Sequence, residues 1–418
     1  MEPLRRCWCN QDMKRSLSPR IASAAVLLGT TLLMSGVVAA RPAHAGGIPA
    51  LQIRDAGGVR IIADGGGPTT ADLRPGVVNV NGAFIASTAR DATTKRQRTK
   101  VTVHNGWTGA TEWSSTVNGL WRPEALSLDG TRVFLGSRDA SPDPETVPRG
   151  RLESRMAIIE RDRAALFVTL PGNFVAEAFT VADALDRRVA LIEHIPPSSP
   201  TAYRVRILDP SVGRISDPIG KDKQPIVIET MQGTRYAHVW SRDGKAIYTL
   251  YQAPNETFVH ALDLVTGIAK CLDVPADVRA GAGSGAIDVS NDGAIVVAGR
   301  GGVVKLDATS GRTVQHTPKP LGPESVTATA LKASGSDIVV SRGSVIFTLD
   351  PQTLSIRAQV KLPRPNDVRA LADMPYPAFI AVDRRGDIWW SGLGSVPFRR
   401  AHTDMPTTGA VTVAVAPV

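Results

Sequence analysis

The feature that most restricts the fold is a unit that recurs along the chain, a tight turn followed by a short β run. Asp243-Gly244 precedes the run at residues 247–250, and Asp292-Gly293 precedes the run at residues 295–297. One residue marks the β run of each copy: Phe84, Phe134, Ala190, Tyr248, Val296, Val339 and Ile380. Successive markers lie 41–58 residues apart. Four-stranded blades of β-propellers recur at this spacing.

A second unit follows the stronger copies, a strand that ends in Leu-Asp before a short turn. Its four copies are Leu208-Asp209, Leu262-Asp263, Leu306-Asp307 and Leu349-Asp350, separated by 54, 44 and 43 residues. An Asp carboxylate accepts backbone N–H groups two residues further on, and a following Gly supplies a positive φ. We therefore predict a hairpin between the two outer strands of each blade.

The predicted fold is all-β, with residues 46–418 forming one seven-bladed β-propeller. The 38 Gly and 30 Pro residues favour many turns, and no window shows sustained helical periodicity. Dividing the mature chain by seven gives about 53 residues per blade. Two β-sandwich domains are the alternative, but they would not repeat a Leu-Asp hairpin. Either residues 411–415 or residues 59–61 are expected to complete a blade built from both termini.

Residues 1–45 have the three parts of a secretory signal peptide. Basic residues precede an apolar run at residues 21–40, and Ala43-His44-Ala45 provides a small-x-small cleavage site. The protein is therefore expected to be secreted or held in the cell envelope, with no transmembrane segment after cleavage. The alternative that residues 21–40 stay in the membrane as an anchor remains open, because this run is long enough to span a bilayer.

Removal of the signal changes the charge and the cysteine content. Residues 1–45 carry six Lys and Arg residues and two Asp and Glu residues, so +5 of the formal +9 remains. This mild excess argues against a nucleic-acid-binding protein, in which basic residues cluster. Cys7 and Cys9 leave with the signal, so Cys271 alone remains and no intramolecular disulfide can form. A monomer is expected.

The central third of the mature chain contains several distinctive segments, among them Leu170-Pro171-Gly172-Asn173-Phe174, Leu191-Ile192-Glu193-His194 and Phe258-Val259-His260-Ala261-Leu262-Asp263. In these segments the chain resembles a group of exported actinobacterial β-propeller proteins, and more loosely propellers of the tyrosine-valine-threonine-asparagine and tryptophan-aspartate repeat types. The group has no characterised activity. The resemblance therefore implies a fold and an exported location, and it implies no catalytic residue.

Three polar residues are candidates for a site at the channel mouth, where the innermost strand of each blade begins. Glu124 and His238 each lie five residues before the Asp of a turn, and Glu177 occupies the matching place in another blade. Two carboxylates and an imidazole could bind a divalent cation or act as acid and base. Alternatively, they line a wet channel without a chemical role. No cofactor is indicated, and no metal-binding motif is present.

Other segments have weaker signals. His194 and His260 lie in apolar strands, where bonding within the sheet is favoured over metal binding. The irregular stretch 136–155 is the best candidate for contact with a protein or a cell-wall polymer. Trp107, Trp113 and Trp121 could stack on a sugar but more often fill gaps between blades. The sequence thus favours a binding scaffold over a hydrolase or lyase that uses Glu124, Glu177 and His238.

Overall fold

The computed structural model describes residues 50–415, except for gaps within this range. The gaps are 56–57, 63–70, 92, 94–96, 138–149, 182–187, 217, 220–229, 280–284, 318–320, 322–327, 334–336, 363–367, 374–377, 384–386, 393–397 and 403–411. The chain divides into two compact units, Met1–Gly47 with Val418 and Ile48–Pro417, and the described residues belong to the second. The predicted signal peptide lies outside them. Within them, no helix has the length and apolar character needed to cross a bilayer.

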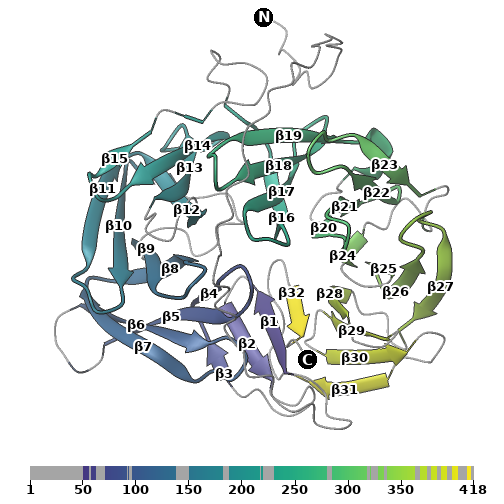
Figure 1. The fold of residues 1–418 in the computed structure, drawn as a ribbon, viewed down its shortest axis with the longest axis horizontal. Helices are drawn as coiled ribbons and strands as arrows, with labels where there is room; N and C mark the ends of the chain where they lie inside the picture. The colour runs from purple at the N-terminus through teal and green to yellow at the C-terminus, as the bar shows by residue number, and fades with distance from the viewer. Residues whose placement is uncertain are drawn as a thin grey trace, which may run out of the picture. The chain divides into compact units, whose positions relative to one another are not determined.

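The described strands form eight four-stranded antiparallel sheets arranged in a ring (Figure 1). Blade 1 consists of β32 (Thr412–Val415), β1 (Leu51–Asp55), β2 (Gly58–Ile62) and β3 (Ala71–Leu73). Blades 2–8 each use four consecutive strands. Blades 2–4 comprise β4 (Gly76–Val78), β5 (Phe84–Arg90), β6 (Arg98–Asn105) and β7 (Thr111–Asn118); β8 (Trp121–Leu126), β9 (Arg132–Ser137), β10 (Glu153–Glu160) and β11 (Leu166–Pro171); and β12 (Asn173–Phe179), β13 (Val189–Ile195), β14 (Ala202–Asp209) and β15 (Arg214–Ile215).

Blades 5–8 continue the same pattern. They comprise β16 (Thr234–Trp240), β17 (Ala246–Gln252), β18 (Thr257–Asp263) and β19 (Ala269–Val274); β20 (Ala286–Val289), β21 (Ile295–Ala298), β22 (Val303–Leu306) and β23 (Thr313–His316); β24 (Ala328–Lys332), β25 (Ile338–Arg342), β26 (Val345–Leu349) and β27 (Ile356–Lys361); and β28 (Val368–Asp373), β29 (Ala378–Asp383), β30 (Asp387–Gly392) and β31 (Phe398–His402). A 3₁₀ turn, η2 (Ala276–Val278), joins blades 5 and 6.

The predicted β-propeller is confirmed, but it has eight blades rather than seven. All seven sequence markers lie on the second strand of a blade, from Phe84 in β5 to Ile380 in β29. The additional blade is blade 1, in which β32 pairs with β1. Its first and second strands come from opposite ends of the chain, so no turn joins them. Blade 1 therefore lacks the turn and following β run that marked the other seven blades in the sequence, and it was not counted.

Both termini build blade 1. Residues Thr412–Val415, within the predicted stretch 411–415, pair with Leu51–Arg54, and residues 59–61 lie in the next strand, β2. β32 is the innermost strand of blade 1, in the position that β4, β8 and the other first strands occupy in their blades.

The Leu-Asp hairpins are confirmed as the turns between the third and fourth strands. Asp263 Oδ1 accepts the backbone N–H groups of Val265 at 2.8 Å and Thr266 at 3.0 Å, and Gly267 has a φ of 70°. The corresponding carboxylates of Asp209, Asp307 and Asp350 accept N–H groups in the same way. Local side-chain chemistry thus fixes each of these turns.

Replacing Gly267 by Val should lower the free energy of unfolding by about 1–3 kcal/mol, because a β-branched residue resists a positive φ. A Cβ at this position would lie 3.7 Å from its nearest neighbour, on Ile207, so the cost comes from the backbone rather than from a clash. Denaturant unfolding measures the effect. The control is Gly267→Asn, since Asn tolerates this conformation better. Equal stability of Gly267→Val and the parent would contradict the prediction.

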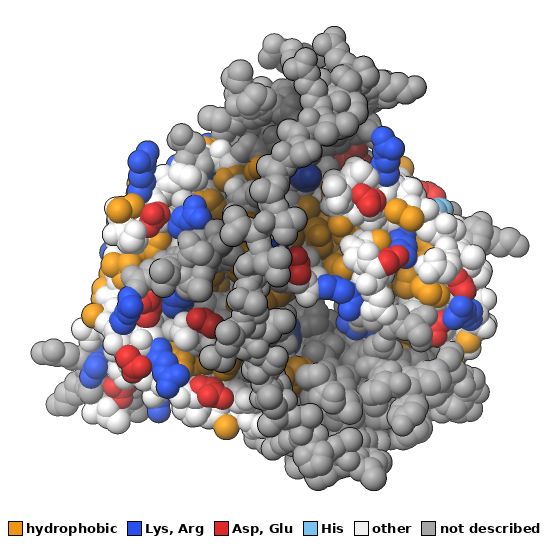
Figure 2. Space-filling model, viewed as in Figure 1, with side chains coloured by type: hydrophobic (Ala, Val, Ile, Leu, Met, Phe, Trp, Pro, Cys, Tyr) orange, Lys and Arg blue, Asp and Glu red, His pale blue; other side chains and the backbone are white. Residues whose placement is uncertain are grey.

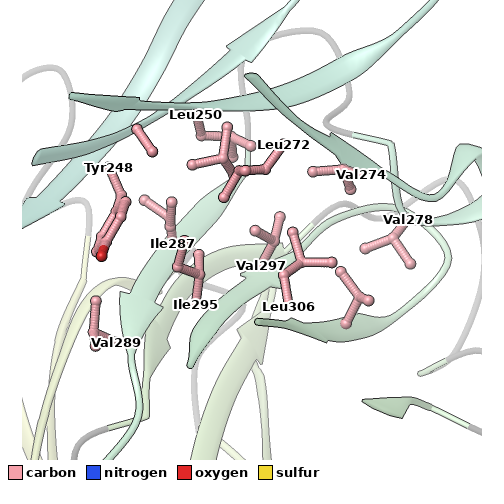
Figure 3. Packing of buried hydrophobic residues seen from close by; sticks show 13 residues of the cluster. Tyr248, Leu250, Leu272, Val274, Val278, Ile287, Val289, Ile295, Val297 and Leu306 are labelled. Carbon is pink, nitrogen blue, oxygen red and sulfur yellow. The ribbon is translucent and has the colours of Figure 1, made fainter. Parts of the chain in front are cut away.

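The core consists of apolar clusters between neighbouring blades. Figure 3 shows the cluster between blades 5 and 6, in which Tyr248 and Leu250 of β17 pack against Ile287 of β20 and Ile295 and Val297 of β21. Similar clusters join the other adjacent pairs from blades 1 and 2 to blades 7 and 8. Because both faces of a blade are used for packing, strand ends, connections and outer edges remain for function.

Candidate functional site

The alternating strand directions give the ring two distinct faces. The first strand of each blade begins on what we name the loop face, which also carries the connections between second and third strands. The opposite face, the turn face, carries the turns that follow first and third strands. Glu124, Glu177 and His238 all lie on first strands, in β8, β12 and β16.

Glu124 binds the backbone of the next blade. It is the extra residue of a β-bulge, between Pro123 and Ala125, and its Oε2 accepts the N–H of Ala176 in β12 at 2.9 Å. Its carboxylate also packs so closely on Gly136 that a Cβ there would overlap it. Burial raises the pKa of the Glu124 carboxyl, whereas the Ala176 N–H and nearby arginine charges oppose that shift. Glu124 therefore joins blades 3 and 4.

Glu177 forms an ion pair with the following blade. It is the extra residue of the equivalent bulge in β12, between Ala176 and Ala178. Its Oε2 lies 2.9 Å from Nη1 of Arg235 in β16, and the two side chains are only 6% and 13% exposed. Glu124 and Glu177 thus share one structural role in successive blades, that of reaching the innermost strand of the next blade.

His238 differs from the two glutamates. It pairs directly with Thr249 of β17, and the bulge in β16 lies two residues earlier, at Tyr236. Desolvation of the imidazole by nearby protein atoms and the positive charges of Arg235 and Arg54 lower the pKa of His238. This holds although the residue as a whole is exposed to solvent. The imidazole is therefore neutral near pH 7.

The three candidates have different contacts. Across the described ranges, no hydrogen bond or ion pair joins any two of Glu124, Glu177 and His238. Bulges at Glu124 and Glu177 insert an extra residue that β16 lacks at His238, so the three candidates do not occupy equivalent positions in the pairing of their strands. No group of three His, Cys, Asp or Glu residues suited to a metal ion occurs in the part of the chain described.

The structure instead reveals a polar cluster on the loop face that the sequence did not predict. Arg151 donates from Nε to Oδ1 of Asn173 at 2.8 Å and from Nη2 to the carbonyl of Phe174 at 2.7 Å. Asn173 pairs with His194 in the adjacent strand. Burial and the charges of Arg151 and Arg235 lower the pKa of His194 to about 4, so this imidazole is uncharged at neutral pH. The cluster joins blades 3 and 4.

Hydrogen bonds between a side chain of one blade and the backbone of the next also link blades 5, 6 and 7. Oδ2 of Asp288 in blade 6 accepts the N–H of Ala333 in blade 7 at 2.7 Å. Arg242, in the first turn of blade 5, donates to the carbonyl of Ser290 in blade 6 at 2.9 Å. These contacts involve residues 45 and 48 positions apart, and no local motif announces them.

The remaining sequence candidates have structural roles where they are described. His260 is 3% exposed within β18, and its ring meets those of Tyr203 and Tyr251 edge-on. Trp113 and Trp121 pack in the cluster between blades 2 and 3, which confirms that they fill this gap. Of the stretch 136–155, residues 138–149 lie outside the described part of the chain.

Comparisons with known proteins support the architecture. No protein family and no curated protein matches the sequence. Among solved structures, AztD of Citrobacter koseri is 10% identical, with 89% of this chain and 99% of that chain covered at a TM-score of 0.51. A structure of apo AztD gives 11% identity, 89% and 100% coverage and the same TM-score. Sqt1 of Chaetomium thermophilum, bound to the N-terminus of ribosomal protein L10, is 15% identical, with 76% and 84% coverage and a TM-score of 0.45. At these identities the two AztD structures show a likeness of fold alone.

Proposed function

We propose that this protein is an exported β-propeller that acts as a binding scaffold, in the cell envelope or outside the cell. The proposal rests on one observation, the structural role of the Glu124 and Glu177 side chains. Both carboxylates bind the innermost strand of the next blade, through Ala176 and Arg235. The groups best suited to acid–base chemistry therefore hold neighbouring blades together, and loops on a rigid ring supply the recognition surface.

The partner is a protein or a cell-wall polymer that contacts the loop face. β9 ends and β10 begins on this face, and the connection between them, which includes residues 138–149, is the longest within blade 3. Its C-terminal end is anchored, since the N–H of Arg151 donates to the carbonyl of Pro197 at 2.8 Å. On the face shown in Figure 2, basic and acidic side chains are interspersed among the described residues, in keeping with a partner other than nucleic acid.

Replacement of residues 138–149 by a Gly-Ser segment of equal length tests this assignment. The parent protein should cosediment with isolated cell envelopes and photo-crosslink to its partner, and the variant should lose at least about tenfold in affinity. The control replaces residues 182–187, which lie in the sequence between the end of β12 and the start of β13, and should bind like the parent because these two strand ends belong to the turn face. Equal binding by all three proteins would contradict the proposal.

The mature protein should begin near Gly46, because Ala43 and Ala45 provide the cleavage site behind the apolar run. N-terminal sequencing of material recovered outside the cytoplasmic membrane measures this. An Ala45→Arg variant should be retained as precursor. A chain that begins at Met1 in the membrane fraction would instead favour the anchor alternative for residues 21–40.

A further inference from the structure

Three side chains meet above the backbone of Gly82, where blades 1 and 2 adjoin (Figure 1). Gly82 follows β4 and Trp107 follows β6, so both belong to turns of the turn face. A Cβ at Gly82 would lie 2.9 Å from Nη2 of Arg54 and 3.2 Å from Oε1 of Gln52. It would also lie 3.2 Å from Cζ2 of Trp107. We name Gln52, Arg54 and Trp107 the Gly82 cluster.

Gln52 holds blades 1 and 2 together and orients Arg54. It is completely buried, and its Nε2 donates to the carbonyl of Gly82 at 2.7 Å and to that of Gly106. These bonds fix the amide, so Oε1 of Gln52 accepts a hydrogen bond from Nη2 of Arg54 at 2.9 Å. The contact between the two blades is thus made by Gln52, and Arg54 adds no hydrogen bond of its own to a described residue of blade 2.

Arg54 carries a charge that no carboxylate among the described residues balances. Gln52 is its hydrogen-bond acceptor, and its Nε is buried without one in this part of the chain. Desolvation lowers the pKa of Arg54 to about 10, so the guanidinium stays charged at neutral pH. The same charge acts on His238 across the ring and lowers the pKa of its imidazole. A desolvated cation without a counter-charge is unfavourable, and because Arg54 is partly exposed, an anion from solution can reach it.

Trp107 differs from the two other tryptophans of this region. Trp113 donates from Nε1 to the carbonyl of Gly130 at 2.9 Å, and Trp121 donates to that of Asn118 at 2.5 Å. Both pack in the cluster between blades 2 and 3, which does not include Trp107. Trp107 is partly exposed, and its indole N–H meets no acceptor within the described ranges. An aromatic ring and an N–H donor therefore remain for a ligand beside Arg54.

We propose that the Gly82 cluster binds a sugar that carries a carboxylate group, of the uronic acid type. The Arg54 guanidinium pairs with the carboxylate, and the Trp107 ring packs on the apolar face of the sugar while its N–H donates to a hydroxyl group. One unbalanced cation matches the single negative charge of a carboxylate better than the nearly double charge of a phosphate ester. The site lies on the turn face, so it is separate from the loop-face surface proposed above and does not depend on it.

Titration of the isotope-labelled protein with D-glucuronate, followed by nuclear magnetic resonance, tests the site. The indole N–H resonance of Trp107, identified by its loss in Trp107→Leu, should shift during the titration. Arg54→Gln should raise the dissociation constant at least about tenfold, and Arg54→Lys should recover only part of that loss because it lacks the planar fork. The control is Arg155→Gln in blade 3, whose parent side chain is 69% exposed and which should bind like the parent.

Three further probes separate the parts of the ligand. D-Glucose lacks the carboxylate and acetate lacks the ring, so each should bind at least about tenfold more weakly than D-glucuronate. A phosphorylated glucose should also bind more weakly, and tighter binding of this probe would overturn the assignment of a carboxylate.

Thermal unfolding separates ligand binding from a structural role of Arg54. Arg54→Gln should melt no more than about 2 °C below the parent, because the guanidinium has no counter-charge to lose. Trp107→Leu, which leaves Arg54 and Gln52 in place, should weaken D-glucuronate binding independently. A parent whose Trp107 resonance does not shift, or an Arg54→Gln variant that melts lower but binds D-glucuronate like the parent, overturns the proposal.

Discussion

Replacing Glu177 by Gln is expected to lower the free energy of unfolding by about 3 kcal/mol, because it removes the negative charge that Glu177 places beside the largely buried Arg235 guanidinium. The Glu177 side chain is 6% exposed and that of Arg235 is 13% exposed, and Glu177 Oε2 lies 2.9 Å from Arg235 Nη1. Urea denaturation of the mature protein measures the change. A Glu177→Gln, Arg235→Met double variant should recover part of the loss, since it also removes the largely buried positive charge of Arg235.

Glu153→Gln is the matched control, because Glu153 also pairs with an arginine at 2.9 Å, but with side chains 51% and 69% exposed. Solvent screens such a pair, so the free energy of unfolding should change by less than about 1 kcal/mol. If Glu177→Gln retained full stability but lost an enzymatic activity, the carboxylate would be catalytic rather than structural. That result would restore the hydrolase or lyase alternative.

Removing residues 412–418 is expected to cost about 4 kcal/mol of stability, because it opens the ring at blade 1. The deletion removes β32 and uncovers one edge of β1, whose Leu51 and Ile53 are completely buried in the intact protein. Exposure of an aliphatic side chain costs about 1.5–3 kcal/mol. Loss of four paired residues adds to this cost. Thermal and denaturant unfolding measure the difference.

A shorter deletion separates loss of the strand from loss of the tail. Removing residues 416–418 leaves β32 intact and should leave the melting temperature within about 2 °C of the parent. A peptide that contains residues 411–418, added to the longer deletion, should restore part of the lost stability by pairing with β1. Equal melting temperatures for the two deletions would show that β32 does not close the ring.

The sequence predicted the features that depend on local chemistry. The Leu-Asp turns follow from an aspartate that accepts N–H groups two and three residues on, as Asp263 does, and Gly267 has the positive φ that its position required. The seven markers all fall on second strands because a turn must precede each of them. Blade 1 escaped the count because its first two strands share no turn.

The candidate site was predicted less well, for a different physical reason. Counting residues back from a turn gives a side chain's orientation only when the strand is regular. The bulges at Glu124 and Glu177 break that regularity, and they are set by pairing with a neighbouring strand. The partner of Glu177 lies 58 residues away in another blade, a contact that no local pattern specifies. The sequence therefore identified Glu124 and Glu177 as notable residues, but it did not predict that they bind the neighbouring blade.

The construction of blade 1 from both ends of the chain also governs the order of folding. Blades 2–8 each form from consecutive strands, whereas pairing of Arg54 with Thr412 must close nearly the whole chain into a loop. For about 360 residues, that closure costs of the order of 5 kcal/mol in chain entropy, less whatever the blades already formed have contributed. Of the described strands, the last to be synthesised is thus the one that completes the ring. Separation of β1 from β32 is correspondingly the natural first step when the ring comes apart.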